Sequence, residues 1–216
     1  EWAGSHDLSD AANYDYIGSL MDLENYATYI AAEIVVGNTD TANIKYWRSS
    51  EYDSKWRWIF YDFCWAMNRN DKNSVEYTSG YRRDFFSKYL HPDGHGSGKA
   101  TSTVLSRALL GNASFRQMFL EKVAIMLNEV YTPEKINAMA DRLQGNIAEE
   151  MKYDVDIWND ITYSSWQQHC NHIRDYANNY QNYALKYVQS YFSLGDAEMN
   201  AIFGRTTTLK DTTDGG

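Results

Sequence analysis

A short polar motif followed by two aromatic segments constrains the fold of this chain more than any other feature. The run GNTDTAN at 37–43 leads directly into two alternating aromatic runs, NIKYWRS at 43–49 and KWRWIFYDF at 55–63. The polar stretch EYDS at 51–54 separates these runs and predicts the turn of an antiparallel hairpin. We therefore expect an aromatic β-hairpin with a polar loop at its open end.

The expected register brings three oxygen-bearing side chains together. A turn centred between Tyr52 and Asp53 places Asn43 opposite Asp62, and Trp47 opposite Trp58. Directly opposed residues of a hairpin lie roughly 5 Å apart at Cβ.

Asp40, Asn43 and Asp62 are thereby gathered at the open end of the hairpin, and such oxygen donors are typical ligands of a hard cation such as magnesium. The alternative interpretation is a polar loop beside a hairpin, because structural acids are common.

The same residues resemble a known family. The segments MDLENYATYIAAEIVVGNTDTANIKYW at 21–47 and KWRWIFYDFCWAMN at 55–68 resemble the CotH kinase family, the atypical protein kinases named after a bacterial spore-coat protein. Members share a helix, Gly-Asn-x-Asp, a later Asn, and an aromatic strand that ends in Asp. The resemblance spans about residues 20 to 195 and continues weakly into the last helix, at 166–192.

The resemblance implies transfer of phosphate from ATP to a protein hydroxyl with Mg. It assigns Asp40 as the catalytic residue that orients the acceptor, and Asn43 and Asp62 as metal ligands. From the residues alone, the alternative for Asp40 is an exposed turn residue after a helix stop, and for Asp62 a strand-end acid that caps a turn.

One position departs from the family pattern. Many relatives carry a second acid two residues after Asp62, where this chain has Cys64. Loss of a carboxylate lowers the negative charge available to a cation, which favours reduced catalytic competence. Asn68 and Asn70 are weaker candidates for additional oxygen ligands.

Composition excludes several classes of protein. The formal charge of −9 opposes nucleic-acid binding, which needs a basic surface. No apolar run reaches the ~18 residues that a membrane span requires. The chain starts with Glu1 and shows no signal peptide, which predicts a mature fragment or a piece of a longer protein. Cys64 and Cys170 are expected to be buried small hydrophobes, with a disulfide between them left open.

The periodicity predicts a mainly α fold with a small β-hairpin, the helical C-terminal lobe of an atypical protein-kinase-like fold. Helices are expected from Asp22 as N-cap to Val36, and over about 85–90, 101–111, 113–130, 133–151 and 163–193. The expected division is an entry segment at 1–20, the lobe at 21–195, and a short helix or linker-like tail at 196–216.

Two helices carry apolar stripes. Helix 133–151 has its stripe at Ile136, Met139, Leu143 and Ile147. The last helix carries a stripe of large and small apolar residues that suits either core packing or a coiled-coil seam, at Trp166, Cys170, Ile173, Ala177, Tyr180, Ala184, Tyr187 and Tyr191.

Other motifs are weaker. The run DGHGSGKA at 93–100 lacks the first Gly and the final Ser/Thr of a phosphate loop, so a flexible loop is expected. His91, Asp93 and His95 alternate in it, as some transition-metal ligands do, but the glycines oppose a preformed site. His169 and His172 are expected to be packing or surface residues. An acidic cluster is formed by Glu149, Glu150, Asp154 and Asp156. It has two interpretations, a solvated helix end or the carboxylate pair of a glycosidase.

A kinase also needs a nucleotide-covering lobe, and no β-rich candidate precedes residue 20. We therefore expect this chain alone to be weak or inactive. The alternative function is a noncatalytic, pseudokinase-like surface module that binds a protein or carbohydrate partner through its aromatic residues. By association with relatives, the expected location is extracellular or on the bacterial cell surface, including the spore coat.

Overall fold

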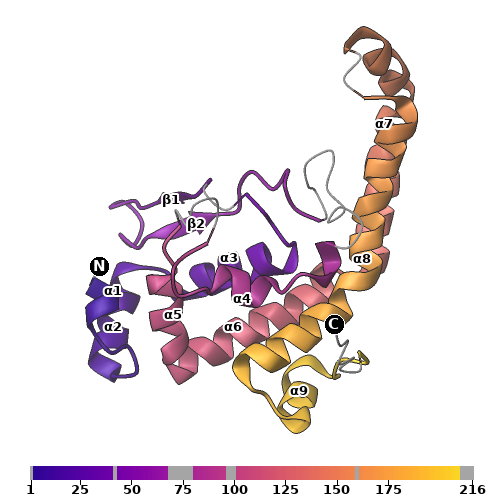
Figure 1. Ribbon diagram of the computed structural model, residues 1–216. Coiled ribbons are helices and arrows are strands. Elements are labelled where there is room, and N and C mark those ends of the chain that lie inside the picture. Colours follow the sequence, from indigo (N-terminus) through magenta and orange to yellow (C-terminus); the bar gives the residue numbers. More distant parts are fainter. Residues whose placement is uncertain (1, 41–42, 68–79, 96–100, 159–160, 210–216) are drawn as a thin grey trace.

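The computed structural model describes residues 2–40, 43–67, 80–95, 101–158 and 161–209 (Figure 1). Its elements in chain order are α1 (Trp2–Ser5), α2 (Ala11–Leu20), α3 (Leu23–Val35), β1 (Lys45–Trp47), β2 (Arg57–Ile59), the 3-10 turn η2 (Gly80–Arg82), α4 (Phe85–Tyr89), α5 (Val104–Gly111), α6 (Ala113–Ile125), the π-helical turn η4 (Met126–Val130), α7 (Pro133–Trp158), α8 (Tyr163–Phe192) and α9 (Asp196–Phe203). The prediction of a mainly α fold with a small hairpin is confirmed.

Polar caps set the ends of these helices. The Asp22 side chain accepts a hydrogen bond from Asn25 N at the start of α3, as expected from the sequence. Thr162 and Ser165 form a capping box at the start of α8. Gly37 follows the end of α3 with φ of 61°, so a glycine provides the left-handed residue after that helix.

The core lies where α3, α6 and α8 meet. Phe115 and Phe119 of α6 are fully buried, and burying a phenylalanine contributes roughly 1.5–3 kcal/mol. Tyr26 of α3 is buried with its hydroxyl 2.9 Å from Ser106 Oγ of α5, so its polar end is satisfied. These contacts make α3 a rigid base for the loop that follows it.

The observed hairpin register differs from the predicted one by one residue. The pairs are Lys45 with Ile59, Tyr46 with Trp58, and Trp47 with Arg57, so Trp47 does not face Trp58. The turn is wider than expected, because Ser54 adopts φ of 58° and its N–H donates to Ser49 O at 3.0 Å. Asn43 and Asp62 therefore lie beyond the paired residues, and the loops rather than the ladder place them.

Helix α7 and the first half of α8 form an arm that projects from the other helices (Figure 1). The α7 helix ends at Trp158, later than the predicted 151, and none of its residues is buried. Three residues of its predicted stripe are about half exposed, namely Met139, Leu143 and Ile147. These apolar side chains are thus only partly covered. The main partner of α7 in the described residues is α8, and Asn137 Nδ2 donates to Asn178 Oδ1 at 2.8 Å between the two helices.

The stripe of α8 is mainly core packing. Trp166, Tyr180 and Ala184 are buried, whereas Ile173 and Tyr191 are each 36% exposed. The coiled-coil alternative is therefore not needed for the half of α8 that crosses the core.

The prediction of buried cysteines is wrong for Cys64. The Cys64 side chain is exposed, Cys170 is half-buried, and no disulfide joins the two. No helix in the described part of the chain combines the length and apolarity needed to cross a bilayer.

Candidate functional site

The three side chains singled out in the sequence meet at one point. Asn43 Nδ2 donates to Asp40 Oδ2 at 2.9 Å and to Asp62 Oδ2 at 3.1 Å. Both carboxylate oxygens lie within hydrogen-bond distance of the same nitrogen, so they are no farther apart than the sum of those two distances. Asp40 comes from the loop after α3, and Asp62 from the segment after β2, which brings two distant parts of the chain into one polar site.

The loop that carries Asp40 is packed against the core at Gly37. A Cβ added at this residue would lie 2.5 Å from the Tyr176 hydroxyl and 2.7 Å from the Phe85 ring. The same hydroxyl donates to Val35 O at 3.0 Å, and that of Tyr180 donates to Ile34 O at 3.0 Å. Two α8 tyrosines therefore satisfy the last carbonyls of α3 and fix the point where the loop begins.

Asn38 holds the backbone of Asp40 from the buried side. Its Oδ1 accepts from Asp40 N at 3.1 Å, and its Nδ2 donates to Asp40 O at 3.0 Å. Asn38 in turn contacts Glu33 and Tyr89, both buried. Burial is the main cause that raises the pKa of the Glu33 carboxyl above its ordinary value, and hydrogen bonds from Asn38 and the tyrosines oppose it.

The loop is also tied to the segment after Asp62. Thr39 donates to Trp65 O through its N–H at 3.1 Å and through its hydroxyl at 2.9 Å. Met67 N donates to Val36 O at 2.8 Å. These bonds hold the Asp40 loop and residues 65–67 side by side.

Asp62 reaches the site through an unusual backbone conformation. Its φ of 59° lies in the left-handed region, where Asp is among the few non-glycine residues found. This residue follows β2 by three positions, so the left-handed turn reorients its side chain after strand pairing has ended. No local pattern in the sequence predicts this turn.

Cys64 contacts the metal-ligand candidate beside it. The Cys64 thiol donates to Asp62 Oδ1 at 3.3 Å, within the accepted range for sulfur. The position at which the family resemblance led us to expect a second acid thus holds a weak donor against the Asp62 carboxylate.

The donors present fit a magnesium ion shared with phosphates. Two carboxylates and one amide converge. Among the described residues, no three or more His, Cys, Asp or Glu side chains are grouped so that they could hold a metal ion by themselves. Magnesium is commonly held by one or two carboxylates while substrate phosphates and water complete its octahedron. Asp62 would supply a carboxylate to such an ion. The Asn43 amide, whose nitrogen faces the two carboxylates in this structure, would supply its oxygen after the amide group turns over.

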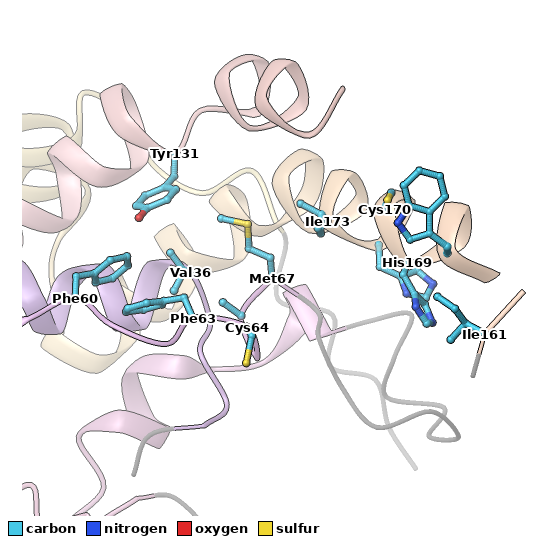
Figure 2. Close-up of a pocket in the computed structure, with 13 residues that line it drawn as sticks. Val36, Phe60, Phe63, Cys64, Met67, Tyr131, Ile161, His169, Cys170 and Ile173 are labelled. Atoms are coloured by element: carbon cyan, nitrogen blue, oxygen red, sulfur yellow. The ribbon is translucent and has the colours of Figure 1, made fainter. Parts of the chain in front are cut away.

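A cavity of about 580 Å³ adjoins this site (Figure 2). Residues 60–67 form one wall through Phe60, Phe63, Cys64 and Met67, and α8 forms another through His169, Cys170 and Ile173. Figure 2 shows Tyr131 above the first wall and the α8 side chains beyond Met67. Cys64 belongs to both the cavity lining and the Asp62 contact, so the two features are continuous.

From the sequence, His169 and His172 are expected to be packing or surface residues, and Cys170 a buried small hydrophobe. The signal that was available is the polar and thiol character of His169, Cys170 and His172 within an otherwise apolar stripe. Their position beside the Asp62 segment depends on tertiary contacts that no local pattern encodes.

The weaker candidates do not form sites in the described residues. His91 Nδ1 accepts from Asp93 N at 3.2 Å, whereas His95 packs on the Tyr89 ring at 4.7 Å, so the three alternating residues do not gather around one point. The acidic residues 149, 150, 154 and 156 are exposed on α7, in agreement with a solvated helix end. Asn68 and Asn70, and the part of the glycine-rich run at 96–100, lie outside the described residues.

Comparison with known proteins gives one match. The family model described as CotH kinase protein matches residues 3–184, which is most of the chain. The comparison with curated proteins found no match, and neither did the comparison with solved structures.

Proposed function

This chain belongs to the CotH kinase family, and we propose that it serves phosphoryl transfer from ATP to a protein hydroxyl with Mg. In this proposal Asp40 orients the acceptor hydroxyl and accepts its proton, while Asn43 and Asp62 hold the metal. The observation that carries the proposal is the shared hydrogen bonding of both carboxylates to Asn43 Nδ2. A protein kinase needs such a pairing of an acceptor-side acid with metal ligands.

The chain's own residues support the two roles differently. The backbone of Asp40 is held at both its N–H and its C=O by Asn38, which fixes the direction in which its carboxylate meets an acceptor. Asp62 is half-buried, and one of its oxygens faces Asn43 while the other accepts from Cys64. A bound magnesium ion would supply charge neutralisation at the phosphates, and Asp62 and Asn43 are the residues that would hold it.

We further propose that this chain contributes the acceptor and metal side of a larger site, as the helical C-terminal lobe of the kinase-like fold. The only sheet in the described residues is the two-stranded β1–β2, which does not make a nucleotide-covering lobe. Transfer by these 216 residues alone is expected to be weak, and an extracellular or bacterial surface location is part of the same proposal.

The test is transfer of labelled phosphate by the longest natural protein that contains this chain. Asp40→Asn and Asp62→Ala should each reduce transfer by about 100-fold or more, since general-base and metal-holding groups contribute on that scale. Asp15→Ala, an exposed acid on α2, is the matched control. Unchanged transfer in either site variant would remove the role assigned to that residue.

A noncatalytic binding module is the second candidate, favoured by the exposed aromatic residues of the hairpin. Tyr46, Trp47 and Tyr52 expose 59%, 41% and 71% of their surfaces. Aromatic residues are the usual anchors of protein and carbohydrate interfaces. A thermal shift with Mg and nucleotide, absent in Asp62→Ala, supports the kinase proposal. Partner binding that is lost in Trp47→Ala, together with no nucleotide shift, supports the module instead.

A further inference from the structure

Glu33 is a buried acid that the proposed reaction does not use. It lies in α3 among apolar residues, exposes only 4% of its surface, and forms no ion pair with a Lys or Arg of the described chain. An ionised carboxylate buried without a cation is costly, and such a group commonly keeps its proton instead.

Counting hydrogens at Tyr89 leads to the same conclusion. The Tyr89 hydroxyl lies 2.7 Å from Asn38 O and 3.0 Å from Glu33 Oε2. A phenol carries one hydrogen, and a backbone carbonyl only accepts, so the shorter contact uses the hydrogen of Tyr89. The second contact is a hydrogen bond only if Glu33 supplies the proton.

The other groups around Glu33 provide no compensating charge. Burial raises the pKa of Tyr29, Tyr89 and Tyr131, so these phenols are neutral, and it lowers the pKa of His95 to about 4. Asp40 is the charged group that faces Glu33, and its negative sign further disfavours ionisation. Lys88 acts on His95 and is not among the charges that act on Glu33.

We propose that Glu33 is a positioning residue that holds a proton, and that its neutral carboxyl joins Tyr89 and Asn38 so that Asn38 fixes the Asp40 backbone. The positioning part of this inference rests on the proposed function. Asn38 Nδ2 donates to Glu33 Oε2 at 3.0 Å, so the same amide group contacts both Glu33 and residue 40. When Glu33 loses its proton, the hydrogen of Tyr89 turns to the carboxylate and Asn38 O loses its donor. The Asp40 loop therefore becomes less ordered as pH rises.

The protonation is tested by thermal unfolding of the full chain over a pH series, which needs no catalytic activity. A carboxyl whose pKa is raised in the folded state stabilises the protein below its unfolded pKa, and that contribution is lost as pH rises through the folded pKa. The Tm of wild type should therefore fall relative to Glu33→Gln as pH rises. Glu121→Gln, an exposed glutamate on α6, is the control and should follow wild type. Parallel curves for wild type and Glu33→Gln would overturn the proposal.

A second measurement does not depend on a folded variant. The carboxyl carbons of ¹³C-glutamate-labelled wild-type protein, followed by NMR, should include one that titrates above the others. Titration of every glutamate near its ordinary pKa would overturn the proposal.

The positioning role is tested by kinetics in the longer natural protein. Glu33→Ala should lower kcat by about 10- to 100-fold and leave the KM for nucleotide near wild type, because the acceptor-side acid alone is displaced. Glu33→Gln should restore part of kcat. We expect kcat of the wild type to decline at alkaline pH, and Glu33→Gln should lack this decline. Equal kcat in wild type and Glu33→Ala would overturn the role. Absence of transfer by the wild-type protein would remove the proposed function and the positioning role, whereas the Tm series would still decide the protonation.

Discussion

The two carboxylates of the site have supports of different character. Asp40 follows α3, and its loop is held by buried groups of α3, α4 and α8. Asp62 follows β2 in a hairpin whose strand β1 is exposed at every residue. One acid is thus anchored in the core, and the other is carried by a surface element.

The hairpin is attached to the body mainly along one edge. Trp58 N donates to Asn25 Oδ1 at 2.7 Å, and Asn25 Nδ2 donates to Trp58 O at 3.2 Å. Arg57 bonds the Asp22 carboxylate at 3.0 Å. The N-terminal end of α3 therefore holds the Asp62 side while its C-terminal end holds the Asp40 side, so one helix sets the distance between the two acids. Four experiments separate the two supports.

The largest expected effect is at Gly37, on the Asp40 side. Gly37→Ala places a side chain at a positive φ and against Tyr176 and Phe85, so unfolding free energy should fall by about 2–4 kcal/mol in chemical denaturation. Gly145→Ala, in the α7 interior with nothing within 4 Å of the added Cβ, is the control and should be neutral or stabilising. Equal effects of the two substitutions would contradict the packing described here.

Asn25 tests the attachment of the Asp62 side. Asn25→Ala leaves a backbone N–H and C=O of Trp58 without their partner, and should cost about 1–3 kcal/mol of unfolding free energy. Asn25→Asp retains the acceptor for Trp58 N and should recover part of the loss. If both variants match wild type in denaturant titration, the hairpin is held by other contacts.

Lowering the pH should destabilise the Asp40 side of the protein through protonation of His95. Its pKa of about 4 in the folded protein lies below the unfolded value near 6.5, so between these values the unfolded state binds a proton that the folded state does not. Stability should fall as pH drops from 6.5 to 4, by about 1 kcal/mol once solvent screening of this partly exposed ring is allowed for. Tm measured against pH in His95→Phe should lack that component, and an unchanged slope would refute it.

The smallest effect is expected at the tip of the hairpin. Tyr52 is 71% exposed, and its ring contacts the Arg57 guanidinium at 4.8 Å. Tyr52→Ala should change unfolding free energy by no more than about 0.5 kcal/mol in urea titration. A loss as large as that of Asn25→Ala would show that the hairpin tip is a structural element of the Asp62 side.

Helix α3, which supports both acids, was predictable because its signals are local. Asp22 at the start and Gly37 after the end act within one turn of backbone. The hairpin register was not predictable, because it depends on Ser54 adopting a left-handed conformation that serine seldom takes.

The residues of the site were predictable from the sequence, but their arrangement in space was only partly predictable. The meeting of Asp40, Asn43 and Asp62 was predicted from a hairpin register that is shifted by one residue in the structure, where the loops bring these side chains together. Their roles remain predictions. Glu33 was missed because an acid on a helix normally implies exposure. Its apolar neighbours on both sides, in AAEIVV at 31–36, were the available signal.

The α7 helix was predictable from the period of its apolar residues, but the period does not say how far a neighbouring element covers them.

The continuity of α8 has a mechanical consequence. Its 30 residues form one helix, roughly 45 Å long at 1.5 Å per residue, that begins in the arm and ends beside the core. The hydroxyls of Tyr176 and Tyr180 connect this helix to the end of α3 by hydrogen bonds to the α3 carbonyls. A sideways load on the arm therefore becomes a torque at the end of α3, five to six residues before the acid that would meet the acceptor.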